Sequence, residues 1–311
     1  MKKKKKRVLV ILGGRSRERE ISLETGKACI REIKKLGYNV IKFDPKLSSL
    51  DEIKKKNISL IFNALHGKGG EDGTIQSYFE YSCIPYTHSG VVSSMLAMNK
   101  YLSKELFIKS KICTPNYFFL NKKDFPKVNL NNKIRSNNIK FPVVIKPNNE
   151  GSSIGVKICK NLKNLGKEFK KLKKSYDDLI FESYIPGQEV QVAVIGGKSI
   201  GAIELRPKRK FYDYKAKYKK SSKTLHIMPA EIPKKKYLEV LRISEKANKV
   251  LKCKGIVRCD FRFYKNKFFL LELNTQPGMT KLSLVPEIAK FSKIPFINLV
   301  KWMINDAGIN R

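Results

Sequence analysis

The alternation of short apolar strands and helices in the first hundred residues is the feature that most constrains how this chain of 311 residues folds. Apolar strands are expected at residues 7–12, 40–43 and 58–63. A helix capped by Ser16 separates the first two strands, and a shorter helical stretch at residues 48–56 precedes the third. This β-α-β-α order predicts a parallel sheet with helices on its faces.

The pattern changes from about residue 116, where apolar strands follow one another with fewer helices between them. The Gly196-Gly197 pair between two of these strands is a strong hairpin signal. The expected strands cover residues 141–146, 154–159, 178–185, 189–195, 199–206, 256–264 and 268–274, and the expected helical regions are 91–109, 234–253 and 288–304. We therefore predict a mixed α/β and α+β chain with three lobes at residues 1–98, 99–186 and 187–311.

The charge of the chain is strongly basic, with a formal net charge of +38 at pH 7. Lysine supplies 53 of the 65 basic residues and is spread along the whole sequence. Nucleic-acid sites usually recruit arginine for bidentate contacts and place aromatic side chains beside it. The composition therefore argues against specific nucleic-acid binding, while weak, salt-sensitive adhesion to polyanions stays open.

The apolar runs and the cysteine spacing indicate the cellular compartment of the protein. No run approaches the roughly 20 apolar residues of a membrane-spanning helix. The basic start is followed by an apolar run that is too short for a signal peptide and that ends in Gly13-Gly14. The cysteines lack a C-x-x-C pair, which fits neither a zinc site nor a disulfide framework. We expect a cytoplasmic protein with no membrane partner and with mostly buried, apolar cysteines.

The last two strands form the most informative segment. If a three-residue turn at 265–267 joins them, Asp260 lies opposite Glu272 and Arg258 lies opposite Asn274. These oxygen ligands suit Mg²⁺ or Mn²⁺ beside phosphate groups, although a solvated face with incidental charges is the alternative. The opposite face is entirely apolar and supports the register independently, with Val257, Cys259, Phe261 and Phe263 against Phe269, Leu271 and Leu273.

Three loops are further candidates for contacts with a ligand. The loop at 146–155 offers a lysine, backbone N–H groups and serine hydroxyls to an anion, although an ordinary turn is the alternative and no Walker motif is present. The loops at 13–18 and 66–73 follow strands of the expected parallel sheet, at the edge where ligands bind in open α/β sheets. Glu18 either receives an ammonium group there or pairs only with the helix dipole.

In order and spacing, these segments resemble the D-alanine–D-alanine ligase family of the ATP-grasp superfamily. The resemblance runs essentially from end to end, and it is most specific in the His66 loop and in the last motif. The motifs that carry it are LGGRSREREIS (12–22), ALHG (64–67), EDGT (71–74), EGSS (150–153), FYDY (211–214), AKY (216–218) and ELNTQPGMT (272–280). The resemblance implies a three-lobed ATP-grasp fold with an N-terminal parallel-sheet (preATP-grasp) domain. It also implies ATP-dependent ligation of two D-alanines for peptidoglycan precursor synthesis.

The resemblance further implies roles for individual residues. Two Mg²⁺ or Mn²⁺ ions would be held by Asp260, Glu272 and Asn274. ATP would be bound by Lys100, Lys146, Gly151, Ser152, Ser153, Glu182, Tyr184, Ile185, Glu189 and Lys217. The D-alanines and the oxyanion would be bound by Glu18, His66, Ser152, Tyr218, Arg258, Gly278, Ser283 and Leu284. Glu18 would take the ammonium group of the first D-alanine, and the segment at 208–226 suits a lid.

Some positions depart from the family pattern, and two related activities compete with this reading. Lys215 replaces an acidic residue of the lid motif, Ser183 replaces a frequent lysine, and Lys281-Leu282 replaces a small or polar pair. These changes bear on lid closure and on substrate affinity.

A relative using D-lactate or D-serine is the nearest alternative, against which Tyr218 argues. Another ATP-grasp amide ligase would lack Tyr218 and the His66 loop. The resemblance suggests a homodimer.

Overall fold

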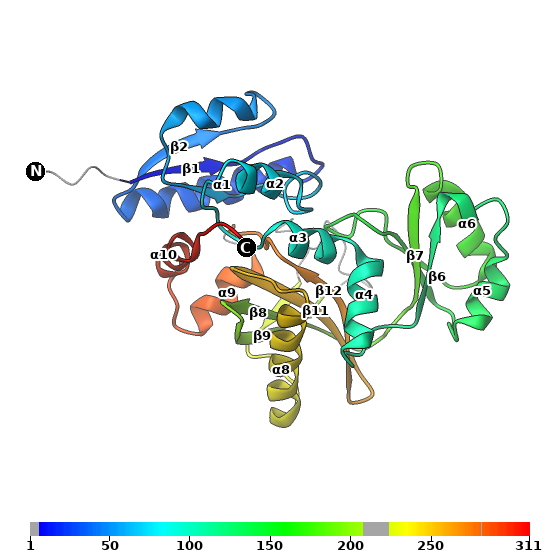
Figure 1. Cartoon of the computed structure of the whole chain (residues 1–311). Coiled ribbons are helices and arrows are strands. Elements are labelled where there is room, and N and C mark those ends of the chain that lie inside the picture. The colour runs from blue at the N-terminus through cyan, green and yellow to red at the C-terminus, as the bar shows by residue number, and fades with distance from the viewer. Residues whose placement is uncertain (1–5, 208–223, 281) are drawn as a thin grey trace, which may run out of the picture.

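The computed structural model of the chain describes residues 6–207, 224–280 and 282–311. Within these ranges the chain forms three β-sheets with helices packed around them (Figure 1). One sheet is parallel and two are antiparallel, which confirms the predicted mixture of α/β and α+β structure. No helix of the described ranges has the length and the apolar character that crossing a membrane requires.

The first sheet, called the parallel sheet below, has the strand order β2-β1-β3. Its elements are β1 (Arg7–Ile11), α1 (Arg19–Lys35), β2 (Asn39–Phe43), the 3₁₀ helix η1 (Leu50–Lys56), β3 (Leu60–Asn63) and α2 (Thr74–Tyr81). Strands β1 and β3 are buried along nearly their whole length. Continuous burial is typical of parallel strands that are covered on both faces, so the predicted arrangement is confirmed.

The start of α1 differs from the prediction that Ser16 caps this helix. Glu18 occupies the N-cap position instead. The Ser16 hydroxyl donates a hydrogen bond of 2.6 Å to the backbone carbonyl of His66 and accepts one of 3.1 Å from the N–H of Glu18. Ser16 therefore ties the loop after β1 to the loop after β3 at the carboxyl edge of the parallel sheet.

The helix predicted at 91–109 is divided into α3 (Val91–Met98) and α4 (Lys100–Lys109). Asn99 lies between them in an extended conformation, and its side chain accepts a hydrogen bond of 3.0 Å from the N–H of Leu102. This side-chain cap starts a new helix within an apolar pattern that contains neither glycine nor proline. The break places Lys100 at the first position of α4, beside the backbone carbonyl of Asn148 at 3.2 Å from its N–H.

The second sheet, called the central sheet, is antiparallel with the order β4-β7-β5-β6. Phe118 and Phe181 stack at 4.5 Å between ring centroids in its core, which two helices help to cover. The elements are β4 (Tyr117–Asn121), the 3₁₀ helix η2 (Lys122–Asp124), α5 (Leu130–Ser136), β5 (Val143–Pro147), β6 (Lys157–Cys159), α6 (Leu162–Leu172) and β7 (Asp178–Ser183).

The third sheet, called the C-terminal sheet, is antiparallel with the order β10-β9-β8-β11-β12. The predicted hairpin at Gly196-Gly197 is confirmed, because Ile195 pairs with Lys198 across these two glycines. The predicted helical region at 288–304 is two helices. The elements are β8 (Gln188–Ile195), β9 (Lys198–Arg206), β10 (Leu225–Ile227), α8 (Lys234–Val250), β11 (Ile256–Tyr264), β12 (Lys267–Asn274), α9 (Leu284–Phe291) and α10 (Phe296–Asp306).

The register of β11 with β12 is confirmed at its functional end and was wrong at its turn. Arg258 pairs with Asn274 and Asp260 with Glu272, as predicted. At the other end, however, Tyr264 pairs with Lys267 across a two-residue turn in which Lys265 and Asn266 have φ of 46° and 61°. Positive φ at both central residues is typical of a type I′ hairpin turn.

A β-bulge after Asp260 reconciles the two ends of this hairpin. Phe261 pairs with Leu270, so Leu271 is the extra residue of β12. As a result Phe268 and Leu270 are buried in the core, where Phe269 and Leu271 were predicted. The bulge instead turns Leu271 toward the cavity described below, next to Glu272.

The parallel sheet and the C-terminal sheet share one hydrophobic core. Val10 and Phe62 belong to the same buried cluster as Ile256, Leu299 and Met303. Helix α10 packs against α1, and the backbone N–H of Tyr86 donates to the carbonyl of Gly308 at 3.0 Å. This common core holds the loops after β1 and β3 against the ends of β11 and β12 (Figure 1).

Candidate active site

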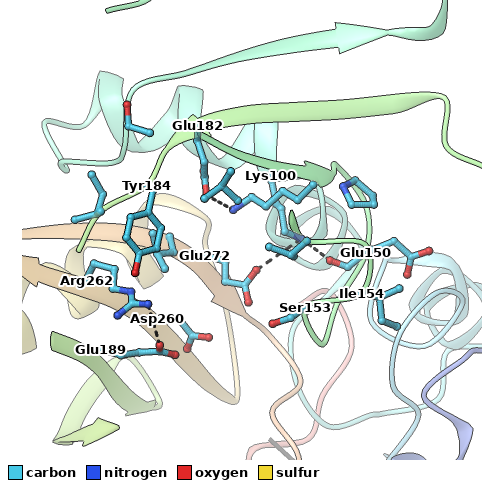
Figure 2. A pocket seen from close by; sticks show the side chains of 17 residues that line it. Lys100, Glu150, Ser153, Ile154, Glu182, Tyr184, Glu189, Asp260, Arg262 and Glu272 are labelled. Carbon is cyan, nitrogen blue, oxygen red and sulfur yellow. Dashed lines mark hydrogen bonds and ion pairs between the residues drawn. The ribbon is translucent and has the colours of Figure 1, made fainter. Parts of the chain in front are cut away.

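Two adjoining cavities lie where the three sheets approach one another, and Lys100, Glu150 and Glu272 line both of them. The first cavity lies between the central and C-terminal sheets (Figure 2) and is lined mainly by Val144, Lys146, Ser153, Glu182, Ser183, Tyr184, Ile185, Glu189, Asp260, Arg262 and Leu271. The second reaches the loops of the parallel sheet and is lined mainly by Glu18, His66, Glu71, Gly151, Ser152, Arg258, Asn274 and Gly278.

The first cavity has an apolar slot with a charged pair at its side. Val144, Ile185 and Leu271 supply apolar walls. Arg262 lies 6.0 Å from the ring centre of Tyr184, and its guanidinium is 3.5 Å from the carboxylate of Glu189 (Figure 2). An apolar slot with a few polar groups at its rim is the usual form of a site for a flat heterocyclic ligand.

A buried line of three charges leads inward from this cavity, which Lys146 and Glu182 line and which Lys104 does not reach. One carboxylate oxygen of Glu182 lies 2.6 Å from Nζ of Lys146, and the other lies 3.0 Å from Nζ of Lys104. Burial opposes ionisation of Glu182, but the two lysines outweigh it and lower the pKa of this carboxyl group. Burial also lowers the pKa of Lys104 to about 8, and its ammonium group donates to Thr114 Oγ1 at 2.5 Å.

Lys100 stands between the two cavities. Its Nζ donates a hydrogen bond of 2.5 Å to the backbone carbonyl of Glu150 and lies 3.7 Å from the carboxylate of Glu272 (Figure 2). Burial lowers the pKa of Lys100, and the charge of Glu272 opposes that effect. A buried ammonium group next to a glycine-serine loop is well placed to meet a phosphate.

The predicted oxygen ligands lie together at the functional end of the β11-β12 hairpin. Arg258 binds both carboxylate oxygens of Asp260, at 2.7 and 2.8 Å. The side-chain oxygen of Asn274 accepts a hydrogen bond of 2.7 Å from the N–H of Gln276, which fixes the orientation of the amide. Two carboxylates and an oriented carbonyl oxygen, each already matched by a positive or donor group, fit a divalent cation that prefers oxygen ligands.

The second cavity contains two buried carboxyl groups. Glu18 is 5% exposed, and the Ser152 hydroxyl donates a hydrogen bond to it across 134 residues of sequence. Glu71 accepts a hydrogen bond of 3.0 Å from the N–H of Gly67. Burial, together with the charge of Glu18, raises the pKa of Glu71. Gly151 packs directly against this pair, because a Cβ placed on it would lie 3.0 Å from Glu18 Oε2.

His66 is buried beside these carboxylates and is electrically neutral at pH 7. Burial lowers the pKa of its imidazole to about 4, and the nearby Arg258 acts in the same direction. Its Nε2 lies 3.1 Å from the hydroxyl of Thr25. The ring therefore works as a hydrogen-bonding group that helps to shape the cavity, rather than as a cation.

The loop after β12 supplies the remaining predicted residues. Gly278 lines the second cavity, and a Cβ on it would lie 2.9 Å from Ser283 Oγ. Ser283 precedes α9, accepts a hydrogen bond of 2.9 Å from the N–H of Thr280, and is followed by the buried Leu284. Ser283 and Leu284 thus stand behind Gly278.

Sequence reasoning named most of these residues and missed three. Lys104 lies four residues after Lys100 on one face of α4, a spacing that signals a shared environment. Arg262 lies two positions after Asp260 on the same face of a strand. Glu71 belongs to the motif at 71–74, but no role was predicted for it. Residues 208–223 of the lid predicted at 208–226 lie outside the described residues, and with them Lys215, Lys217 and Tyr218, as does Lys281. At the end of the predicted lid, Leu225 and His226 belong to strand β10.

Family models match most of the chain. A model described as "D-ala D-ala ligase C-terminus" matches residues 106–305, and one described as "D-ala D-ala ligase N-terminus" matches residues 42–89. The two models together include the His66 loop, the glycine-serine loop with Lys146, and the β11-β12 hairpin, whereas Glu18, Lys100 and Lys104 lie outside the matched residues.

Named relatives and solved structures agree with these matches. The chain is 51% identical over 309 residues to the D-alanine–D-alanine ligase of Pelagibacter ubique (strain HTCC1062), covering 98% of this chain and 99% of that protein. It is 44% identical to that of Wolbachia sp. subsp. Brugia malayi (strain TRS), covering 96% and 92%. Crystal structures of the D-alanine–D-alanine ligase from Bacillus anthracis superpose with TM-scores of 0.86, at 33% identity, and of 0.85 for the complex with ATP, at 30% identity, each covering 97% of both chains. The chain therefore belongs to the D-alanine–D-alanine ligase family.

Proposed function

We propose that this chain joins two D-alanines to D-alanyl-D-alanine, converts ATP to ADP and phosphate, and so supplies the dipeptide for peptidoglycan precursors. One observation carries the proposal besides family membership. The cavity with the apolar slot and the buried lysines meets the cavity with the buried carboxylate Glu18, and Lys100 and Glu272 line both. A phosphoryl donor in the first cavity can therefore face a carboxylate acceptor in the second.

The first cavity suits ATP along its whole length. Glu182, Tyr184 and Ile185 would line the adenine, and Glu189 would hold the ribose at the rim. Lys100 and Lys146 would meet the phosphates, where buried ammonium groups stabilise negative charge more strongly than they do in water. The loop Gly151–Ser153 and Lys217 would close over the same end of the nucleotide.

The hairpin end suits two divalent cations, Mg²⁺ or Mn²⁺. Asp260, Glu272 and Asn274 would hold them, with Glu272 shared between the two positions. Metal ions bound there would neutralise the charge of the phosphates and align the γ-phosphoryl group. The fit rests on the three oxygen donors and on the orientation of Asn274 by the N–H of Gln276.

The first D-alanine would bind in the second cavity. Glu18, oriented by the Ser152 hydroxyl, would receive its ammonium group, with His66 as a neutral wall. A carboxylate oxygen of this D-alanine then forms a bond to the γ-phosphorus, and the bond from that phosphorus to the bridging oxygen of ADP breaks. The product is an acyl phosphate, which must be shielded from water to survive.

The second D-alanine would react as a free amine. Its nitrogen forms a bond to the acyl carbon, and the resulting oxyanion lies at Arg258 and the N–H of Gly278. Phosphate leaves as the carbonyl reforms. Ser283 and Leu284 would hold the carboxylate of this second substrate, and Tyr218, together with Ser152, would orient Glu18 and the second D-alanine.

The proposal also covers the compartment, the oligomeric state, nucleic-acid binding and the division of the chain into lobes. We propose a cytoplasmic homodimer without a specific nucleic-acid partner, divided into lobes at residues 1–98, 99–186 and 187–311. The three separate sheets support this division, although α10 extends from the last lobe onto α1. The spread of lysine along the sequence supports the exclusion of a specific nucleic-acid site, and a salt-titrated binding assay checks it because nonspecific adhesion vanishes at moderate salt.

The decisive test is phosphate release from ATP and Mg²⁺ with D-alanine, with L-alanine, or with D-alanine plus D-lactate. We expect release that depends on D-alanine, yields the dipeptide in preference to the D-lactate ester, and collapses in Asn274→Ala. Release that ignores D-alanine would mean a different substrate, and a predominant ester product would assign the chain to the D-lactate branch.

A further inference from the structure

Gln276, in the loop after β12, is a buried residue for which the mechanism above has no use. It is 1% exposed. Its side-chain oxygen accepts a hydrogen bond of 2.9 Å from Nδ2 of Asn63, and its Nε2 donates to the backbone carbonyl of Leu65. Its backbone N–H donates to Asn274, and its backbone carbonyl faces the His66 ring as a hydrogen-bond acceptor. Each polar group of Gln276 thus has a partner.

Asn63 is equally enclosed on the opposite side. It ends β3, is fully buried, and also donates from Nδ2 to the carbonyl of Gly70 at 3.1 Å. Its side-chain oxygen accepts a hydrogen bond of 3.1 Å from the N–H of Leu65. Asn63 therefore shapes both ends of the loop at 65–70 while it holds Gln276, which lies 213 residues away in the sequence.

The two loops that this pair joins carry opposite halves of the proposed reaction. The loop after β3 contains His66 and Gly67, and Gly67 holds Glu71 beside Glu18. The loop after β12 runs from Thr275 to Gly278, whereas Asn274 still belongs to β12 and pairs with Arg258. The distance between the site for the first substrate and the oxyanion donors therefore depends on how these loops are held together.

Burial makes this connection stiff. Neither side chain can rotate away without leaving buried polar groups unpaired, which is unfavourable in a protein interior. The two hydrogen bonds of the planar Gln276 amide fix the relative orientation of the two loops as well as the distance between them.

We propose that Gln276 and Asn63 are positioning residues that fix the loop carrying Gly278 relative to the loop carrying His66. This inference rests on the proposed function. It assigns the pair to the second half of the reaction, in which the amine must reach the acyl carbon while Gly278 meets the oxyanion. A displacement of about 1 Å at such a site costs on the order of 100-fold in rate.

The signature of this role is uncoupling of the two half-reactions. If the loops shift, the acyl phosphate still forms, because Asn274 stays paired with Arg258 in β12 and the contacts of Lys100 and Lys146 lie elsewhere. Attack by the second D-alanine then slows, and water consumes a larger share of the intermediate. The ratio of phosphate released to dipeptide formed rises above one, which mere loss of stability does not cause.

The experiment compares Gln276→Met with Gln76→Met. Both glutamines are 1% exposed, and Gln76 donates from Nε2 to the carbonyl of Gly70 at 3.0 Å, within the loop after β3. For Gln276→Met we expect dipeptide formation to fall at least tenfold, the phosphate-to-dipeptide ratio to exceed two, and KM for ATP to change less than twofold. Gln76→Met removes a buried amide from the same region without touching the loop after β12, and it should keep a ratio of one.

Two further variants keep the test decisive if Gln276→Met folds poorly. Gln276→Glu preserves the shape and the bond to Asn63 but places an acceptor against the carbonyl of Leu65, so we expect the same uncoupling. Asn63→Leu should raise the ratio as well, and the double variant Asn63→Leu/Gln276→Met should raise it no further than either single change.

The outcomes separate this inference from the proposed function. A ratio of one in Gln276→Met and Gln276→Glu, or the same ratio in Gln76→Met, would overturn the positioning role while leaving the ligase activity intact. Absence of D-alanine-dependent phosphate release in the unmodified chain would overturn both.

Discussion

Replacing Lys104 by methionine tests whether the buried line of charges beneath the first cavity exists as described. Its side chain is fully buried, with Nζ 3.0 Å from Glu182 and 2.5 Å from Thr114. Methionine keeps most of the length and removes the charge. Two effects then oppose each other. Glu182 loses one of its two partners, while the protein no longer has to hold a charged amine away from water.

The pH dependence of stability isolates the second effect. Burial lowers the pKa of Lys104 from 10.5 to about 8, so between these values the unfolded chain holds a proton that the folded chain lacks. Stability of the native protein therefore rises with pH across this window. Each pH unit between the two pKa values is worth about 1.4 kcal/mol. From pH 7.5 to pH 10, the native protein should gain about 2 kcal/mol relative to Lys104→Met.

The assay is urea unfolding of both proteins at pH 7.5 and at pH 10. Other groups that titrate in this range are shared and cancel in the difference. Lys109→Met on the same helix provides the control, because Lys109 is exposed and its replacement should give a difference that stays constant with pH. If the free energies of unfolding of the native protein and Lys104→Met differ equally at both pH values, the account of this buried lysine is refuted.

Three further predictions concern acid stability, the first substrate and the nucleotide. Burial lowers the pKa of His88 to about 3, so its contribution to the free energy of unfolding is present above pH 6.5 and is lost as the pH falls. Between pH 6.5 and pH 4, the free energy of unfolding measured in urea should fall by about 3 kcal/mol less in His88→Gln than in the native protein. Glu18→Gln should raise KM for D-alanine at least tenfold and leave KM for ATP within twofold in initial-rate assays, since Glu18 lines the second cavity and not the first. Arg262→Met should raise KM for ATP about fivefold with little change in that for D-alanine, because it frees the rim carboxylate of Glu189 from its 3.5 Å ion pair. Equal effects on both substrates would contradict either assignment.

The parts of the fold that repeat a simple pattern were predictable. The parallel sheet follows from alternating strands and helices, and the pairing of Asp260 with Glu272 follows from one polar and one apolar face. The bulge at Leu271 was not predictable, because an added residue shifts the apolar pattern by one position and Phe269 and Leu271 look as apolar as Phe268 and Leu270. Only the packing of the folded sheet selects between these sets.

Breaks that depend on a distant partner were equally hidden. The apolar pattern from Val91 to Lys109 continues through Asn99, and the helix divides there because Asn148, far along the chain, receives the N–H groups of the new first turn. The same holds for Ser16, which sequence places at a helix start and the fold assigns to the carbonyl of His66. The family resemblance supplied roles for residues that would touch ligands. It supplied none for Lys104 and Gln276, which act through other residues.

The transfer of oxygen from D-alanine to phosphate tests the central claim most directly. D-alanine labelled with ¹⁸O in its carboxylate is incubated with the enzyme, ATP and Mg²⁺, and the released phosphate is analysed by mass spectrometry. If the carboxylate attacks the γ-phosphoryl group and the amine then displaces phosphate, each phosphate formed with the dipeptide carries one ¹⁸O atom. Phosphate without the label would contradict the acyl-phosphate route and the facing arrangement of the two cavities.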